Sequence, residues 1–172
     1  MKKGALLTTL FAVLVVMGLT AGDLLWAKTS FLSPTFVKEL CKQWNNSALP
    51  GKLGSSGNGW VTTGGKSTQV MIIFARKCSR PKVQMTITDV GGEAKCTYGG
   101  AKKNSADWQF GPTPKQWKRW GTGRWSKMNM PALMQTFKGN IAVAKKNIKN
   151  FGIFWKVARK VVQSTGSGYN CN

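Results

Sequence analysis

Residue types that carry out catalysis are scarce in this chain. Its 172 residues include no histidine and only five acids, of which Glu39, Asp89, Glu93 and Asp107 follow Lys28. A Ser–His or Cys–His nucleophile pair and a histidine metal ligand are therefore excluded, and no carboxylate pair suits acid/base work. The glycines of residues 51–54 do not match a phosphate-binding loop. We expect a protein that is not an enzyme and that needs no cofactor and no metal.

Four cysteines are the remaining reactive side chains. They are Cys41, Cys78, Cys96 and Cys171, and their spacing contains no CxxC motif. This weakens both a zinc site and a thioredoxin-like redox motif. One or two disulfides among the four are expected, and the sequence leaves all three complete pairings open.

The N-terminus resembles a secretory signal peptide. Lys2 and Lys3 precede an apolar run over residues 5–19, which is shorter than the ~20 residues of a membrane-spanning helix. Cleavage after Ala27 gives a signal peptide over residues 1–27 and a single domain over residues 28–172. The protein is then exported, periplasmic or secreted, where disulfides persist. A retained N-terminal anchor is the alternative.

Charge indicates the kind of partner. With 26 lysines and arginines, the chain has a formal net charge of +21 at pH 7, above the magnitude of ~2 to 8 usual for a small domain. Anionic lipid, acidic polysaccharide and nucleic acid are the candidate polyanions. Export argues against nucleic acid, whereas a basic, tryptophan-rich surface suits an anionic membrane. The residues expected on this membrane or polyanion surface are Trp117, Lys118, Arg119, Trp120, Arg124, Trp125, Lys145 and Lys149. Alternatively, the tryptophans are half core and the lysines a solvated face.

A helix, a set of strands and further helices must position these residues. Ser33 and Pro34 favour a helix start, followed by an apolar face that includes Val37, Leu40 and Trp44. Alternation and turn residues predict antiparallel strands over residues 60–63, 69–75, 82–88, 94–98 and 107–110.

Three helices are expected in the remainder of the chain. One follows Pro112 and ends at Gly121, and a second follows Pro131 with Leu133, Met134 and Phe137 on it. The apolar stripe over residues 140–163 predicts one long helix, with a kink at Gly152.

Three short segments carry a resemblance to a known family. They are residues 106–110 (Ala-Asp-Trp-Gln-Phe), 117–121 (Trp-Lys-Arg-Trp-Gly) and 137–144, in which Gly139-Asn140 opens the last helix. With the order of elements over residues 33–162, this pattern resembles the sterol carrier protein 2 superfamily. The resemblance implies an α+β fold with a five-stranded, mostly antiparallel sheet covered by helices. It also implies a tunnel between sheet and helices that binds sterols, fatty acyl chains or similar apolar molecules without chemistry.

The resemblance favours an apolar ligand site over a simple core. Its wall is expected to contain Ile72, Phe74, Met85, Trp108, Phe110, Phe137, Ile148, Phe151 and Trp155. Alternatively, these residues only fill the core. The expected function is binding or transfer of a lipid-like molecule, with docking on an anionic membrane surface. An exported polyanion-binding protein without a ligand cavity is the alternative.

Overall fold

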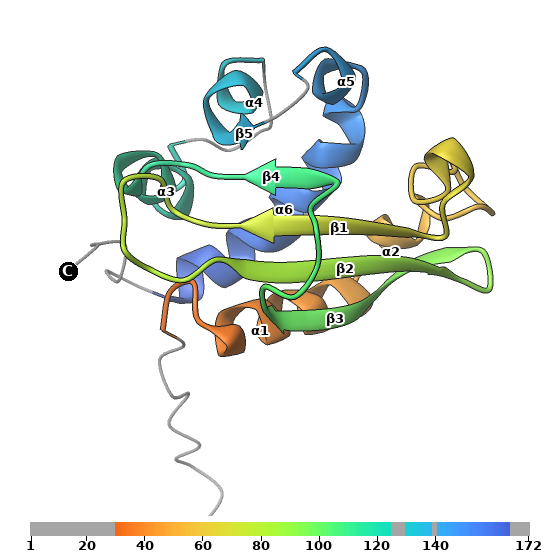
Figure 1. Ribbon diagram of the computed structural model, residues 1–172, viewed down its shortest axis with the longest axis horizontal. Coiled ribbons are helices and arrows are strands. Elements are labelled where there is room, and N and C mark those ends of the chain that lie inside the picture. Colours follow the sequence, from red (N-terminus) through yellow and green to blue (C-terminus); the bar gives the residue numbers. More distant parts are fainter. Residues whose placement is uncertain (1–29, 125–129, 139–140, 166–172) are drawn as a thin grey trace, which may run out of the picture.

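A mixed five-stranded sheet, with helices α1 and α6 against one face, organises the protein (Figure 1). The computed structural model describes residues 30–124, 130–138 and 141–165. The predicted signal segment and its cleavage site therefore lie outside the described residues.

The sheet contains five strands. They are β1 (Thr68–Ile73), β2 (Val83–Val90), β3 (Glu93–Ala101), β4 (Trp108–Phe110) and β5 (Phe137–Lys138). Their order is β3-β2-β1-β4-β5, and every pairing is antiparallel except the parallel β1–β4 pair. The expected fold class, α+β with a mostly antiparallel sheet of five strands, is confirmed.

Helix α1 (Pro34–Asn45) begins where the sequence predicts. The Ser33 hydroxyl accepts a hydrogen bond from the Phe36 N–H at 3.1 Å, and Pro34 occupies the first turn. The buried face of the helix includes Leu40 and Trp44, and the Trp44 indole donates to the Ala94 carbonyl at 3.0 Å. Tertiary contacts and the capped first turn together hold α1 against β3.

The two faces of the sheet differ in what covers them. Met71 pairs with Met85 across β1 and β2, and both side chains are fully buried in the core on the helix side. On the other face, the segment over residues 102–107 crosses the sheet to connect edge strand β3 with β4 (Figure 1). The buried Gln84 side chain anchors it, because its Oε1 accepts the N–H groups of Lys103 and Asn104, each at 2.8 Å.

The predicted strand over residues 60–63 is wrong. Trp60 and Val61 are buried, but they lie in a turn that leads to the short 3-10 helix η1 (Thr63–Gly65). Gly59 and Gly64 have φ values of 66° and 73°, a left-handed backbone that turns the chain out of an extended path. The fifth strand is instead β5.

The predicted long C-terminal helix is two helices. Helix α5 (Ile141–Lys146) ends before Asn147, and α6 (Ile148–Ser164) follows it. The Asn147 amide donates to the Val143 carbonyl at 3.0 Å and its oxygen accepts from Asn150 at 3.0 Å. Asparagine side chains compete for backbone partners in this way and so interrupt helices. Gly152, the predicted kink, lies inside α6.

Three more helices complete the described part. Helix α2 (Ala48–Gly51) follows α1, α3 (Pro114–Gly121) follows β4, and α4 (Met130–Thr136) precedes β5. The start of α3 is defined by a capping box, in which Thr113 and Gln116 satisfy each other's backbone N–H groups. Phe137, predicted on the helix before it, belongs to β5.

Candidate ligand and membrane surfaces

An aromatic cluster lies where α3 and α6 cover β4 and β5. Phe110 is fully buried, and its ring centroid lies 5.1 Å from Phe137 and 6.0 Å from Trp155. The Phe137 and Phe151 ring centroids are 4.1 Å apart. Five of the nine expected ligand residues share this continuous core: Met85, Phe110, Phe137, Phe151 and Trp155. Trp108 and Ile148 are partly buried against it.

The other two expected ligand residues do not join this cluster. Ile72 alternates with Met71 and Ile73 along β1, so its side chain points to the opposite face of the sheet. Phe74 is half-buried, with the Lys82 ammonium 5.2 Å from its ring centroid. Strand alternation therefore separates Ile72 from the helix side, and Phe74, which follows the end of β1, is not part of the continuous core.

Trp117 and Trp120 are not surface residues. Each is 1% exposed, and the Trp120 ring stacks on Trp155 with centroids 4.2 Å apart. A three-residue spacing places both tryptophans on the one buried face of α3. The expectation that they contact a membrane or polyanion is wrong, and Trp125 lies outside the described residues. Lys118 and Arg124 are exposed as expected, and Arg119 is half-buried.

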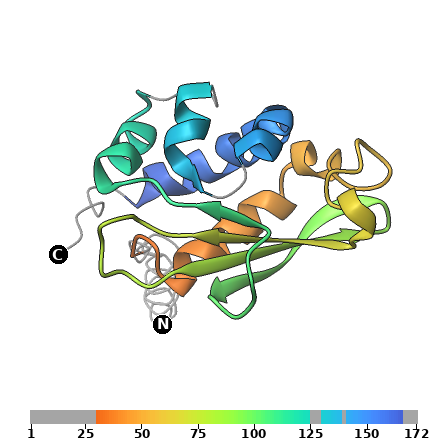
Figure 2. The ribbon, with the colours of Figure 1, turned by 45° about the horizontal axis from the view of Figure 1, so that its top comes forward.

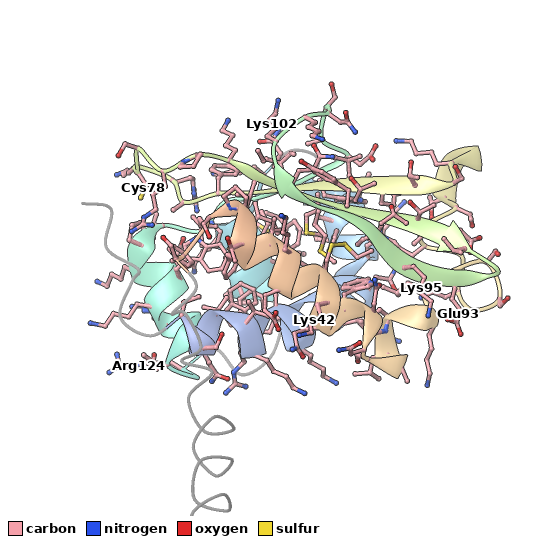
Figure 3. The ribbon with its side chains drawn as sticks, turned by 90° about the horizontal axis from the view of Figure 1, so that it is seen from below. Lys42, Cys78, Glu93, Lys95, Lys102 and Arg124 are labelled. Atoms are coloured by element: carbon pink, nitrogen blue, oxygen red, sulfur yellow. A yellow bond between two sulfur atoms is a disulfide. The ribbon has the colours of Figure 1, made fainter. Side chains whose placement is uncertain are left out.

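Cations surround a cavity on the outer side of α3. The cavity is about 350 Å³ in volume and is lined by Lys115, Lys118, Arg119, Thr122 and Arg124. The four residues from α3 and its C-cap recur at helical spacing, so they share the face opposite the buried tryptophans. Figure 3 shows Arg124 just beyond the end of α3, at the opposite end of the molecule from Glu93 and Lys95.

A second surface combines exposed apolar and cationic side chains. Within the described residues, three of the five large hydrophobic side chains that are exposed come from α4 and α5: Met130, Met134 and Val143. These helices lie side by side at the β5 edge of the sheet (Figures 1 and 2). Lys145, Lys146 and Lys149 are exposed on α5 and the start of α6. We call these six residues the docking surface.

No acid lies near the docking surface in the sequence. From residue 108 to residue 172 the chain contains no aspartate or glutamate. The ion pairs in the described ranges are Lys66–Asp107 and Lys95–Glu93, neither of which involves a lysine of the docking surface. Those lysines are therefore available to an anionic partner.

A smaller cavity lies between the turn at Trp60 and helix α5. Its volume is about 230 Å³, and it is lined by Trp60, Thr63, Lys66, Gln69, Asp107, Trp108, Lys138, Val143 and Asn147. The Trp60 and Trp108 rings are stacked with centroids 6.2 Å apart, and the Phe151 ring makes a T-shaped contact with each of them. The buried Gln69 amide fixes this pair, since it accepts from the Trp108 indole at 2.9 Å and donates to the Val61 carbonyl at 3.1 Å. Of its residues, only Trp108 was expected at a ligand site from the sequence.

A disulfide links helix α1 to strand β3. Cys41 on α1 is bonded to Cys96 on β3, with 5.2 Å between their Cα atoms (Figure 3). Cys78 is also disulfide-bonded, and Cys171 lies outside the described residues. The expected disulfides are thus confirmed for Cys41 and Cys96 as a pair.

The described ranges contain neither a metal cluster nor a membrane-spanning helix. No cluster of three His, Cys, Asp or Glu side chains that could hold a metal ion occurs among them. Likewise, none of the helices in residues 30–124, 130–138 and 141–165 is both long and apolar enough to cross a membrane.

Comparison with known proteins gives likeness in fold. No family model and no curated protein sequence matches this chain. It is similar to the solution structure of a conserved hypothetical protein from Thermus thermophilus, with 16% identity and a TM-score of 0.45 over 76% of this chain and 88% of that one. It is also similar to the crystal structure of sterol carrier protein 2, with 14% identity and a TM-score of 0.45 over 77% of this chain and 97% of that one.

Proposed function

We propose that this chain is an exported, non-enzymatic protein that docks on anionic lipid bilayers and carries an apolar ligand. The observation that carries the proposal is the docking surface. Met130, Met134 and Val143 are exposed on the neighbouring helices α4 and α5, and the three exposed lysines of α5 and the start of α6 form no ion pair within the described ranges. Apolar side chains enter the interfacial layer while lysines meet anionic headgroups. A purely soluble polyanion would not favour the exposed methionines.

A disulfide bond supports export of the protein. A disulfide between Cys41 and Cys96 suits the periplasm or an extracellular space, where thiols are oxidised. The apolar run over residues 5–19 after two lysines supplies the expected signal. In this proposal the domain over residues 28–172 remains after cleavage.

Removing the lysines of the docking surface tests the membrane part. The variant Lys145→Ala/Lys146→Ala/Lys149→Ala should bind vesicles of phosphatidylcholine and phosphatidylglycerol about 100-fold more weakly at low salt, since each lysine near such a surface contributes about 1 kcal/mol. Vesicle co-sedimentation measures this. The matched control is Lys38→Ala/Lys42→Ala/Lys102→Ala, which removes the same charge from positions on α1 and after β3. Equal losses in both variants would mean that net charge alone drives binding.

The ligand part of the proposal uses the residues on the helix side of the sheet. These are Met85, Trp108, Phe110, Phe137, Ile148, Phe151 and Trp155. Two buried donors beside them, the Trp120 indole Nε1 and the Arg159 Nε, have no hydrogen-bond partner in the described part of the structure. An unpartnered buried donor costs about 1–3 kcal/mol. An apolar molecule with one acceptor group could accept a hydrogen bond from one of these two donors, which supports an amphiphile as the ligand.

Export followed by lipid mass spectrometry tests the ligand. The chain purified from the exported fraction should yield a stoichiometric apolar molecule on solvent extraction. A protein that is empty, and that also fails to take up fluorescent fatty acids and sterols, would refute the ligand part while leaving membrane docking intact.

The cavity on α3 favours a second candidate function, polyanion binding. Four cations line it, and no carboxylate does among the described residues. Such a surface binds sulfated polysaccharide through charge alone, so its affinity falls steeply with salt. This function would be favoured over the first if the protein bound heparin through Lys115, Lys118 and Arg124 and did not bind anionic vesicles.

A further inference from the structure

The cavity between Trp60 and α5 has the properties of a second small-molecule site, which shares only Trp108 with the proposed ligand residues of the aromatic cluster. Trp60 borders it but is only 3% exposed, and its indole Nε1 has no hydrogen-bond partner in the described ranges. Buried indole N–H groups usually find a partner. Because the nitrogen itself is covered, an acceptor atom of a bound molecule would supply one once the Trp60 ring turns toward the cavity.

The charges around the cavity sum to one positive unit. Lys66 forms an ion pair with Asp107, and the other Asp107 oxygen accepts the Val70 N–H at 2.7 Å. Both carboxylate oxygens of Asp107 therefore already have partners within the protein. Lys138 is exposed and lies in neither ion pair of the described part. An anion with a single charge matches this arrangement.

The shape and wall of the cavity limit the rest of the ligand. Its volume of about 230 Å³ is below the ~300–1,000 Å³ of sites for drug-sized molecules. A sterol or a long acyl chain does not fit in it. The stacked Trp60 and Trp108 rings favour a flat ring as their neighbour.

We infer that this cavity binds a small aromatic monoanion, with its ring against Trp108 and its acid group on Lys138 and the Trp60 indole N–H. This inference does not rest on membrane docking or on the ligand of the aromatic cluster. The site uses a different set of polar groups and a smaller ligand. It adds a water-soluble ligand class to the lipid-like one.

Calorimetric titration without vesicles tests the inference. The probes are benzoate and 1-naphthoate as aromatic acids, benzyl alcohol as the uncharged ring, and decanoate as the chain acid. At least one aromatic acid should bind saturably, and both neutral alcohol and chain acid should bind about tenfold more weakly or not at all. Saturable binding of decanoate alone would overturn the inference, as would equal affinity for benzyl alcohol.

Two variants and two controls locate the binding. Trp60→Phe keeps an aromatic ring but removes the N–H, and Lys138→Gln removes the charge from an exposed position; each should weaken the aromatic acid about tenfold. Lys102→Gln, at an exposed position after β3, should not change it. The Lys145→Ala/Lys146→Ala/Lys149→Ala variant should also keep it, because those lysines do not line the cavity. Unchanged affinity in both Trp60→Phe and Lys138→Gln would refute the assignment.

Discussion

Replacing Phe110 with alanine should lower the free energy of unfolding by about 3–5 kcal/mol, the usual cost of removing a buried phenylalanine. Phe110 is 0% exposed. Its ring contacts five other rings, with centroid distances of 5.1 to 6.0 Å, from Trp117, Trp120, Phe137, Phe154 and Trp155. Because these rings come from α3, β5 and α6, the cavity left by alanine would be lined by side chains of three elements that cannot all move inward.

Urea unfolding followed by circular dichroism measures this loss. Phe110→Leu should cost less, since leucine keeps much of the apolar volume. Gln109→Ala, at the exposed neighbouring position, should change the free energy of unfolding by less than about 0.5 kcal/mol. A loss below about 1 kcal/mol in Phe110→Ala would contradict the assignment of Phe110 to the centre of the core. It would indicate instead that the surrounding rings can repack to fill the space that the phenylalanine ring leaves.

Removing the Cys41–Cys96 disulfide should lower the free energy of unfolding by about 4 kcal/mol. The two cysteines are 55 residues apart, and closing a loop of that length restricts the unfolded chain by about this amount in the chain-entropy model. The double variant Cys41→Ala/Cys96→Ala avoids a free thiol. Measurement under non-reducing conditions keeps the disulfide of Cys78 intact.

Hydrogen bonds also link α1 to β3 at the site of the disulfide, and they could hold the helix in its absence. Asn45 on α1 accepts the Cys96 N–H at 2.8 Å and donates to the Cys96 carbonyl at 2.9 Å. If the double variant loses less than about 1 kcal/mol, these bonds and the packing of α1 are enough to hold the helix on β3.

Local signals in the sequence predict the first helix and the central strands. Ser33 and Pro34 define the start of α1 through their own chemistry, which does not depend on the rest of the fold. The alternation from Val83 to Ile87 gives one buried and one partly wet face, as β2 shows. Such elements follow from neighbours within a few residues.

The sequence pattern does not predict the turn at residues 60–63 or the break between α5 and α6, which depend on glycine and asparagine. The extended pattern of residues 60–63 is overridden by the left-handed Gly59 and Gly64 on either side. The apolar stripe across residues 140–163 continues through Asn147, although the backbone does not. A periodic pattern records which side chains are buried, and it does not record whether one helix or two bury them.

The sequence predicts which charged residues are exposed, but it does not predict where in the fold the candidate sites lie. Lysines and arginines are mostly exposed in folded proteins, and Lys118, Arg124, Lys145 and Lys149 lie on the surface as expected, whereas Arg119 is half-buried. Trp117 and Trp120 read equally well as surface or core, and packing against Phe110 decides for the core. The cavity at Trp60 joins residues that are far apart in the sequence, and their proximity arises from the β1–β4 and β4–β5 pairings and from the contact of α5 with β5.

The two edges of the sheet bear on how the protein behaves at high concentration. An exposed strand edge is a template for pairing with another chain. Here β5 is only two residues long, and β3 carries an irregular register opposite Thr86 and Ile87. Short strands and bulges both interrupt the row of free N–H and C=O groups that intermolecular pairing needs. The fold therefore resists growing into a continuous β-ribbon, and a concentrated solution of the protein should remain a solution of separate molecules rather than seed fibrils.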